Sequence, residues 1–498
     1  MTIVSPDVKT DPRWSLLDGT LPMLIGGELL ADGPTSNIVS SRDRSVVGKF
    51  AVADAAIADK AVAAARKAAP GWAGLTGFER GKYLLKIAEI MEAHAAEFEF
   101  LDAVDIGKPV TGVRYSDMPV SLSALAYFAG RAQDLGGRSV EVGDPMVSHR
   151  ARLEPYGVVL EVLPWNGPLW TGVQRMAAIL AAGNVAIMKP SELASASFSY
   201  LASLIADVLP PGVLTVLNGK GSVVGARLVT NPDVAMVSLT GGVETGVRVL
   251  QDTASQVKRV SLELGGKNPN IVMADADLDS AIMWSTMGGF SNSGQICVCG
   301  SRILVQKGIY DEFAARLVDA AKKRVVGDPL LDSTEMGPVV GEDHYNKIWG
   351  YIDHAVKNGE GELLVGGEHY TDELRAGGWY VPPTVFGNVT PGCVIEKEEI
   401  FGPVVTLTPF ETLDEALAIA NDTTFGLASG IFTSSVENAE KAARELQAGQ
   451  VYVNQWFAPG GLQAPSQGYK TSGLGGVGIE KYLQTKNIFI RSNNGASW

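Results

Sequence analysis

Residues 157–189 read GVVLEVLPWNGPLWTGVQRMAAILAAGNVAIMK, and this stretch decides the fold class. A short β-branched run at 157–163 precedes an apolar segment of helical length at 168–182, which ends at Gly183. A second short apolar run follows at 185–188. Short apolar runs bounded by turn residues predict buried strands, and a helix that joins two of them predicts a parallel pair. The stretch therefore predicts a strand–helix–strand unit.

The same alternation continues toward the C-terminus. A helix is expected at 195–209, and strands are expected at 213–217, 234–239 and 260–264. Helical crossovers between successive strands produce a parallel sheet that is covered on both faces. This doubly wound architecture binds ligands at the carboxyl ends of its strands, so the residues after each strand are the first candidates for function.

A second set of alternating elements follows Cys297. Strands are expected at 302–306, 403–410, 427–432 and 450–453, and helices at 310–324, 413–420 and 436–446. Before both sets, residues 51–100 have the alanine-rich pattern of helices, while 139–153 and 482–491 alternate like strands. We therefore predict an α/β fold with two doubly wound, Rossmann-like lobes and a small β arm.

Composition limits the class of protein. The chain has 498 residues, too many for one hydrophobic core, and its 46% hydrophobic and 19% charged residues exclude a disordered protein. The net charge of −14 repels phosphate backbones and argues against a nucleic-acid partner. Residues 1–14 lack the parts of a signal peptide, and the most apolar run, 176–188, is too short to cross a bilayer. We expect a soluble, cytoplasmic protein.

Three cysteines, Cys297, Cys299 and Cys393, are too few for a disulfide framework and fit a reducing compartment. Cys297 stands out because it ends the polar stretch SNSGQIC. A free cysteine is most often a small buried hydrophobe, and a reactive one needs a cation, a helix N-terminus or a base nearby. The five histidines show no metal-ligand spacing, so no metal is expected.

Polar residues end three predicted strands of the first lobe. Glu263, in the motif LELGGK, is either a carboxylate facing water or a general base whose pKa is raised by desolvation. Asn166, in LPWNGP, is either a turn residue or an amide donor to an oxyanion, whose loss costs about 3 kcal/mol. Lys189 and Glu192, in MKPSE, form either an ordinary strand-to-helix corner or a pair that binds ribose hydroxyls.

Five motifs occur together in order: Pro-Trp-Asn at 164–166, Lys-Pro-Ser-Glu at 189–192, LELGGK at 262–267, Gly-Gln-x-Cys at 294–297 and EEIFGP at 398–403. At these motifs, and over nearly the whole chain, the sequence resembles the aldehyde dehydrogenase superfamily, specifically its NAD(P)-dependent, hydrolytic (non-acylating) type. The resemblance implies a nucleotide-binding domain at 1–138 and 154–264, a catalytic domain at 265–465, and an oligomerisation arm at 139–153 and 480–498.

The resemblance also implies a role for each motif residue in oxidising an aldehyde to the carboxylic acid. Cys297 matches the nucleophile that forms a thiohemiacetal and then a thioester, and Glu263 matches the base that activates the hydrolytic water. The Asn166 amide and the Cys297 backbone N–H match the oxyanion donors. Lys189 is counted with the catalytic as well as the cofactor residues. The residues that match the cofactor site are Trp165, Lys189, Glu192, Gly241, Gly242, Gly246, Leu264, Glu399 and Phe401.

The implied cofactor is NAD, with NADP as an alternative. Its pyrophosphate is expected at residues 240–246, where a strand leads into a helix N-terminus, and Gly242 replaces a serine of many relatives. Glu192 favours NAD, because a carboxylate repels a 2′-phosphate. The glycines at 219–221 have the wrong spacing for a dinucleotide fingerprint, and we interpret them as a turn that enters a helix.

The C-terminal segment departs from the family pattern. After residues 470–473, relatives usually continue with a longer stretch that contains glycine and glutamate, whereas this chain runs through 474–478 directly into 479–482. The glutamate sometimes proposed to relay protons from that stretch is missing. The route by which Glu263 releases its proton is therefore left open.

The substrate channel is expected to be wide. The residues that match it are Gly167, Trp170, Thr171, Gln174, Ser291, Trp456, Phe457 and Ser466. Several relatives have bulky aromatic residues where this chain has glycine or serine, which leaves the three aromatic residues of the set as apolar walls. The hypothesis is a bulky or aromatic aldehyde. The alternative is that these aromatic residues pack in the core.

Three other functions compete with hydrolytic oxidation. A CoA-acylating semialdehyde dehydrogenase is the nearest, and the presence of Glu263 argues against it. A catalytically silent structural or binding protein tends to lose the nucleophile or the base, and both are present here. A cysteine hydrolase without NAD would not need the nucleotide-site residues. The partners implied are a small-molecule aldehyde and a second copy of the chain, as a homodimer or homotetramer, with no nucleic acid or membrane.

Overall fold

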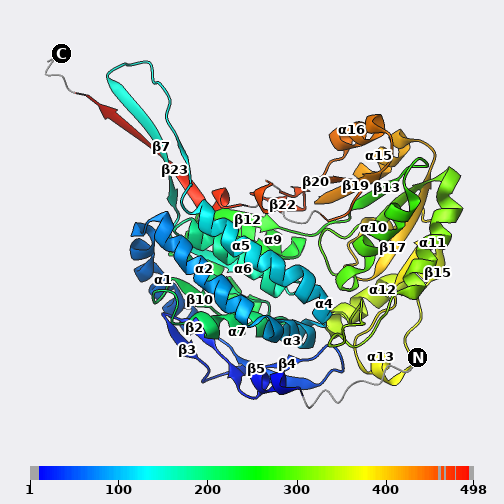
Figure 1. Cartoon of the computed structure of the whole chain (residues 1–498), viewed down its shortest axis with the longest axis horizontal. Coiled ribbons are helices and arrows are strands. Elements are labelled where there is room, and N and C mark those ends of the chain that lie inside the picture. Colours follow the sequence, from blue (N-terminus) through cyan, green and yellow to red (C-terminus); the bar gives the residue numbers. More distant parts are fainter. Residues whose placement is uncertain (1–10, 458–460, 465–466, 477, 493–498) are drawn as a thin grey trace.

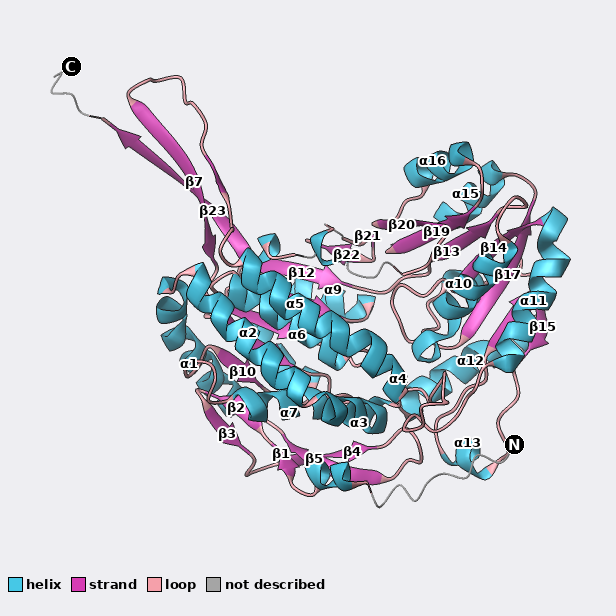
Figure 2. Cartoon of the chain, in the orientation of Figure 1, coloured by secondary structure: helices cyan, strands magenta, loops and turns pink. Residues whose placement is uncertain are grey.

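The computed structural model describes residues 11–457, 461–464, 467–476 and 478–492. Its first lobe contains an eight-stranded sheet (Figures 1 and 2). The strand order is β22-β12-β11-β8-β9-β10-β2-β3. The five central strands are parallel: β8 (Val158–Val162), β9 (Val185–Lys189), β10 (Leu214–Val216), β11 (Met236–Thr240) and β12 (Arg259–Glu263). Antiparallel strands complete the two edges: β2 (Met23–Ile25), β3 (Glu28–Leu30) and β22 (Gly473–Leu474).

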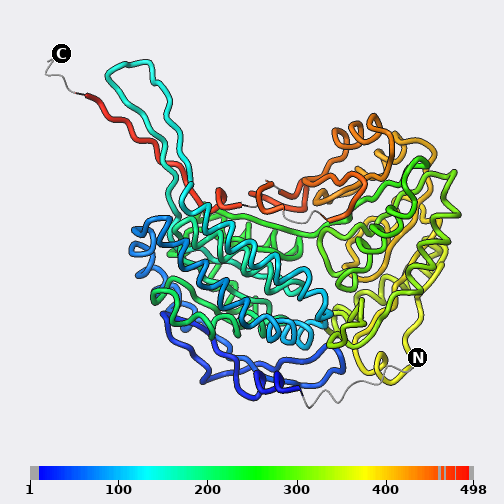
Figure 3. Tube along the Cα trace, viewed as in Figure 1, coloured from blue at the N-terminus to red at the C-terminus, as the bar shows by residue number. Residues whose placement is uncertain are grey.

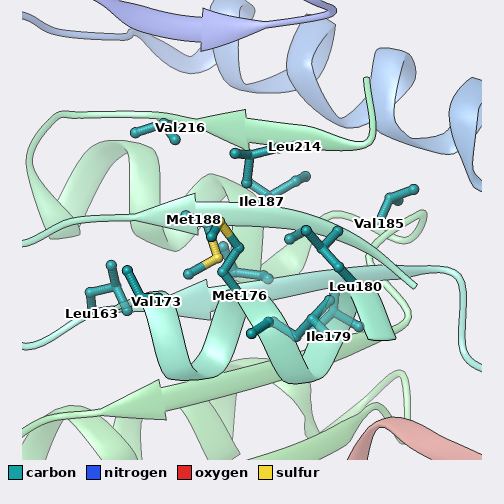
Figure 4. Packing of buried hydrophobic residues seen from close by; sticks show 14 of the residues in the cluster. Leu163, Val173, Met176, Ile179, Leu180, Val185, Ile187, Met188, Leu214 and Val216 are labelled. Atoms are coloured by element: carbon teal, nitrogen blue, oxygen red, sulfur yellow. The ribbon is translucent and has the colours of Figure 1, made fainter. Parts of the chain in front are cut away.

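Helix α6 (Pro168–Ala181) is the crossover between β8 and β9, and it is apolar on nearly every side. Figure 4 shows its side chains, among them Met176 and Leu180, against residues of the strands, among them Ile187 and Leu214. The opposite side of α6 is covered by helices α2 and α5. Because α6 is therefore buried on both sides, its residues are apolar all round. The helices of this lobe are α1 (Ala55–Gly74), α2 (Gly77–Ala93), α3 (Ala95–Ile106), α4 (Val110–Gly112), α5 (Met118–Arg131), α6, α7 (Ala196–Ile205), α8 (Ala226–Thr230) and α9 (Val243–Ala254).

The strand order of the first sheet places a topological switch point between β8 and β11. From β8 toward one edge of the sheet the next strands are β9 and β10, and from β8 toward the other edge they are β11 and β12. The order of the strands therefore reverses direction at β8. Ligands of doubly wound sheets bind outside the carboxyl ends of the strands at such a point. The loops that follow β8 and β11 are therefore the expected site.

The second lobe is built on a seven-stranded sheet in the order β15-β16-β17-β14-β13-β19-β20. Its strands are β13 (Pro269–Val272), β14 (Arg302–Gln306), β15 (Glu362–Val365), β16 (Thr384–Gly387), β17 (Val404–Phe410), β19 (Ala428–Phe432) and β20 (Gln450–Val453), and all but β15 are parallel. Its helices are α10 (Leu278–Phe290), α11 (Tyr310–Lys323), α12 (Glu342–Asn358), α13 (Glu373–Gly377), α14 (Val394–Lys397), α15 (Leu413–Asn421) and α16 (Val436–Glu445). The predicted two-lobed α/β fold is confirmed.

A long pair of strands forms the arm. Strands β7 (Val147–Pro155) and β23 (Leu483–Arg491) run antiparallel over their whole length, with the short β6 (Gly137–Arg138) beside β7, and they project away from the second lobe (Figure 1). The strand predicted at 139–153 begins later, because Asp144 accepts a hydrogen bond from the backbone N–H of Met146 and forms a turn there. Figure 3 shows the C-terminal segment returning from the second lobe along the first and into the arm.

Short elements near the N-terminus were not predicted from the sequence. Strands β1 (Thr20–Leu21), β4 (Thr35–Val39) and β5 (Val46–Ala51) form a separate small sheet, and β18 (Phe425–Gly426) pairs with β21 (Tyr469–Lys470). Strands of two residues carry too little periodicity to be recognised, and β4 and β5 contain exposed polar residues, unlike the buried apolar strands that were predicted. In the described part of the chain, none of the helices combines the length and apolar character that crossing a bilayer requires.

Candidate active site

The switch point brings four of the predicted residues to one edge of the first sheet. Asn166 follows β8, Lys189 ends β9, Gly241 follows β11, and Glu263 ends β12. The backbone N–H of Gly241 donates to the carbonyl of Glu263 at 3.0 Å, so the ends of β11 and β12 are joined beyond the strands themselves. Sequence motifs that lie up to 97 residues apart thus meet at one edge because parallel strands end there.

The loop that carries Cys297 arrives from the second lobe. Helix α10 ends at Phe290, and the next turn contains two non-glycine residues in the left-handed region, Asn292 (φ 49°) and Ser293 (φ 56°). The Ser293 hydroxyl donates to the carbonyl of Gly337 at 2.7 Å, and the Gln295 carbonyl Oε1 accepts from the backbone N–H of Val340 at 2.9 Å. Backbone strain of this kind persists only where the surroundings hold it in place, and it concentrates at functional sites.

The segment that follows β12, residues 264–268 (the β12 exit), packs directly on the Cys297 loop. The Asn268 amide donates to the carbonyl oxygens of Cys297 (2.9 Å) and Cys299 (2.7 Å). A Cβ added to Gly266 would lie 2.6 Å from the Cys297 carbonyl oxygen, so only glycine allows this approach. Gly266 is three residues beyond Glu263, and the Glu263 carboxylate is near enough for its charge to raise the pKa of the Cys297 thiol.

Burial and neighbouring charges shift the pKa values of both candidates. Burial, together with the nearby carboxylates of Glu399 and Glu263, raises the pKa of the Cys297 thiol to about 12. Burial also raises the pKa of Glu263, while the charges of Arg175 and Lys481 lower it. The Oε1 atom of Glu263 is buried without a hydrogen-bond partner among the described residues. Both groups are therefore desolvated, and the negative charge of Glu263 favours the protonated form of the Cys297 thiol.

Asn166 lies against the same loop. Its Nδ2 donates to the carbonyl of Gln295 at 2.9 Å, and the amide of Asn292 donates to the carbonyl of Asn166 at 2.9 Å. An amide nitrogen carries two hydrogens, so the second remains to donate to another acceptor. Asn166 is thus held against Gln295, two residues before Cys297, and one N–H of its amide can still donate to a ligand.

Lys189 and Glu192 lie together at the end of β9. Burial lowers the pKa of Lys189, and the charge of Glu192 opposes that effect. The Glu192 carboxylate accepts from the backbone N–H of Gly221 at 3.1 Å, and Gly225 packs against the Lys189 side chain. The glycines at 219–221 therefore do enter a helical turn, and that turn closes one side of the Lys189–Glu192 pair.

The loop after β11 presents an open helix N-terminus. Gly242 is the N-cap of α9 and has no side chain to satisfy the first backbone N–H groups of the helix, which suit an anion. A Cβ on Gly246 would lie 2.8 Å from Leu264, so this glycine lets α9 pack closely on β12. Leu264 itself is buried. These features fit the pyrophosphate of a dinucleotide.

Glu399, Phe401 and Trp165 line the side of the site that faces the second lobe. Glu399 Oε1 accepts from the backbone N–H of Gly266 at 2.8 Å, and the Trp165 and Phe401 rings meet edge to face at 5.3 Å. Phe401 has φ 61°, a strained conformation that His344 holds by donating to its carbonyl at 2.7 Å. Burial lowers the pKa of His344 to about 4, so the ring is neutral. The carboxylate and the two rings form a cradle for a ribose and a flat ring.

The residues predicted to line the substrate channel lie in different surroundings. A Cβ on Gly167 would lie 2.1 Å from Nε1 of Trp170, so the Trp170 indole fills the space that the glycine leaves. Trp456 has no exposed surface, and its Nε1 donates to the carbonyl of Val298 at 2.9 Å, which is the core packing that was its alternative role. The remaining channel residues fall into three groups: buried Thr171, half-buried Gln174, Ser291 and Phe457, and Ser466, which lies outside the described residues.

Several polar residues of the site were missed by the sequence analysis. Asn268, Asn292 and Gln295 hold the Cys297 loop, and Arg175 and Lys481 place positive charge near Glu263. The first three residues adjoin predicted motifs, so their position in the sequence could have identified them as part of the site. Cys299 is buried, with Sγ 3.5 Å from the carbonyl of Gly294. Within the ranges that the structure covers, no cluster of His, Cys, Asp and Glu side chains could hold a metal ion.

The chain matches known proteins over almost all of its length. The model of the aldehyde dehydrogenase family matches residues 31–488. The human mitochondrial aldehyde dehydrogenase is 40% identical over 456 residues, which cover 90% of this chain and 87% of the relative. The betaine aldehyde dehydrogenase of Bacillus subtilis is 36% identical, covering 93% of this chain and 96% of the relative.

Solved structures agree with the sequence comparison. The crystal structure of Staphylococcus aureus betaine aldehyde dehydrogenase in complex with NAD+ superposes with a TM-score of 0.93 at 36% identity, covering 98% of this chain and 99% of that one. The crystal structure of an aldehyde dehydrogenase from Burkholderia cenocepacia gives the same TM-score at 35% identity, covering 97% and 99%. The strand order, the proximity of Cys297 and Glu263 and these similarities agree with one another. The chain belongs to the aldehyde dehydrogenase family.

Proposed function

We propose that the protein oxidises an aldehyde to the carboxylic acid, with Cys297 as the nucleophile and NAD as the hydride acceptor. The observation that carries the proposal is the packing of the β12 exit on the Cys297 loop, which places the Cys297 thiol, the desolvated Glu263 carboxylate and the Asn166 amide around the same loop. A nucleophile, a base and an oxyanion donor are the groups that acyl chemistry at a carbonyl carbon requires.

The residues at the switch point fit NAD. Lys189 and Glu192 supply a cation and a carboxylate for the adenosine ribose, and the open N-terminus of α9 supplies backbone donors for the pyrophosphate. Glu399, held by Gly266, faces the second ribose. NAD, when bound, supplies the acceptor for the hydride that the tetrahedral adduct loses. The exposed carboxylate of Glu192 favours NAD over NADP, because it would repel a 2′-phosphate.

The side chains and backbone of the protein carry out the other steps of the reaction. The raised pKa of Cys297 keeps the thiol protonated at neutral pH, so the thiol gives up its proton to solvent as the sulfur attacks the aldehyde carbon. The second N–H of the Asn166 amide and the backbone N–H of Cys297 donate to the oxyanion. After oxidation leaves a thioester, Glu263 removes a proton from water, and the hydroxide releases the acid and restores the Cys297 thiolate. Lys189 acts by positioning the cofactor.

We infer an uncharged, bulky or aromatic aldehyde as the substrate. Trp170 and Phe457 leave apolar surface near the Cys297 loop, and the described channel residues include no charged side chain that would recognise a charged substrate. Steady-state rates on benzaldehyde, acetaldehyde and betaine aldehyde test this. The largest kcat/KM is expected for benzaldehyde, and a clear preference for acetaldehyde would contradict the inference.

We further propose that the protein is a cytoplasmic homodimer or homotetramer assembled through the arm. Phe489 and Ile490 of β23 are 62% and 50% exposed, which is costly for a monomer. Light scattering of the whole chain and of Phe489→Glu tests the assembly. A monomeric wild-type protein would contradict it.

The reaction itself is tested by NADH absorbance with an aldehyde panel. The wild-type protein is expected to form NADH and acid without CoA, which separates hydrolytic oxidation from CoA acylation. Cys297→Ala is expected to retain NAD binding and lose turnover. Acid that forms only with CoA, or turnover by Cys297→Ala, would contradict the proposal.

A further inference from the structure

A row of polar side chains crosses the buried first sheet beneath Glu263. Ser238 of β11 is in register with Glu161 of β8 on one side and with Ser261 of β12 on the other. Paired residues of parallel strands point to the same face, and so does Glu263, two residues beyond Ser261. The rise of a strand puts the Cα atoms of Ser261 and Glu263 about 7 Å apart. Buried parallel sheets are otherwise apolar, so this row needs an explanation.

The C-terminal segment caps this row with a lysine and a tyrosine. Lys481 Nζ donates to the hydroxyl oxygens of Ser238 (3.1 Å) and Ser261 (3.2 Å). The hydroxyl of Tyr482 donates to Glu161 Oε2 at 3.2 Å. The row therefore joins three strands to the turn of residues 480–482 through hydrogen bonds.

The backbone that carries Lys481 is anchored on both sides. The Ser261 hydroxyl donates to the carbonyl of Gly476 at 3.3 Å, and the Asn184 amide donates to the carbonyl of Tyr482 at 2.8 Å. Gly475, with φ 94°, packs against Ser261. The position of the Lys481 ammonium is thus set by the fold and does not depend on a mobile surface chain.

Four charged groups face one another across the row. The carboxylates are those of Glu263 and Glu161, and the cations are Lys481 and Arg175 of α6. Burial lowers the pKa of Lys481 to about 7, with Arg175 acting in the same sense and the two carboxylates opposing it. One oxygen of each carboxylate lacks a hydrogen-bond partner in the described structure, so each depends on the cations through charge.

We propose that Lys481 is a positioning residue for the reaction: its charge, held at the row by Ser238 and Ser261, keeps Glu263 ionised and able to accept a proton from the attacking water. The inference rests on the proposed function, since only a reaction that uses Glu263 as base gives Lys481 this role. When Glu263 takes the proton of water, the hydroxide forms the acid and the Cys297 thiolate leaves. A cation nearby then favours return of that proton from Glu263 to solvent and restores the base.

The pH profile of the steady-state rate tests this. The acid limb is the part of the profile in which the rate falls as the pH is lowered and Glu263 becomes protonated. In Lys481→Met, loss of the cation raises the pKa of Glu263, so the acid limb is expected to shift to higher pH by about one unit. Lys481→Arg keeps the charge and is expected to leave the limb in place. Glu161→Gln removes a carboxylate that raises the pKa of Glu263, and the limb is expected to move down. Lys67→Met, at an exposed lysine of α1, is the matched control and should shift nothing.

NADH formation by the wild-type protein separates this inference from the proposed function. The proposed function requires that an aldehyde and NAD give NADH and acid without CoA, and the absence of NADH would contradict that proposal. With NADH formed, an acid limb of Lys481→Met that coincides with the wild type would overturn the role of Lys481. If Lys481→Met does not fold, Lys481→Gln replaces it, because glutamine keeps an amide donor for Ser238 and Ser261 but carries no charge, and an acid limb that coincides with the wild type again overturns the role.

Discussion

Gly266→Ala tests how closely the β12 exit must approach the nucleophile. The added Cβ would lie 2.6 Å from the Cys297 carbonyl oxygen and 2.7 Å from Oδ1 of Asn268, whereas ordinary contact begins at 3.4 Å. The Cys297 loop must therefore move by about 0.8 Å, because the neighbouring atom is backbone and cannot rotate away. A displacement near 1 Å of a reacting group costs on the order of 100-fold in rate. We expect kcat/KM to fall by about that factor.

The assay compares kcat/KM, NAD affinity and thermal unfolding of Gly266→Ala with Gly130→Ala. Gly130 is a glycine of α5 with no atom within 4 Å of an added Cβ, so its alanine variant should keep wild-type activity and gain a little stability. NAD affinity should change little in Gly266→Ala, since the loop after β11 is not displaced. A kcat/KM within twofold of the wild type in a folded Gly266→Ala protein would refute the reasoning.

Three further predictions follow from the same geometry. Asn166→Ala removes an oxyanion donor and should lower kcat by about 100-fold with NAD affinity unchanged; an unaltered kcat would contradict its role. Trp456→Ala empties a fully buried site and should cost about 3–5 kcal/mol in urea unfolding, whereas a loss below about 1 kcal/mol would place the indole outside the core. The pKa of His344 is lowered to about 4 by burial, so its contribution to stability is present above its unfolded pKa of 6.5 and is lost as the pH falls toward 4. Between pH 7 and pH 5 the wild type should lose about 2 kcal/mol more than His344→Asn, and equal losses would contradict this.

The sequence contained enough to predict the fold and the order of the main site residues. Glu263 and Asn166 could be found because each follows a strand of clear apolar pattern, and parallel strands bring such residues to one edge. The predicted strand at 302–306 and the strand at 450–453 coincide with β14 and β20, because β-branched residues form them with polar neighbours at each end.

What could not be predicted depends on contacts distant in sequence. Lys481 lies 218 residues beyond Glu263 in a segment without motif, and only the crossing of β12 by the chain after β22 brings it there. The packing of the Trp170 indole beside Gly167 could not be predicted, because the sequence does not show where a neighbouring side chain turns; the width of the channel stays a prediction. The roles assigned to individual site residues stay predictions.

The central claim is that Cys297 forms a covalent adduct that Glu263 resolves. The most direct measurement is mass spectrometry of Glu263→Gln after acid quench of a mixture with NAD and benzaldehyde. The account predicts one NADH per active site and an acyl group on the peptide that contains Cys297, because the thioester forms but its hydrolysis is slow. NADH formation with an unmodified Cys297, or an acyl group carried by Cys299 instead, would contradict it.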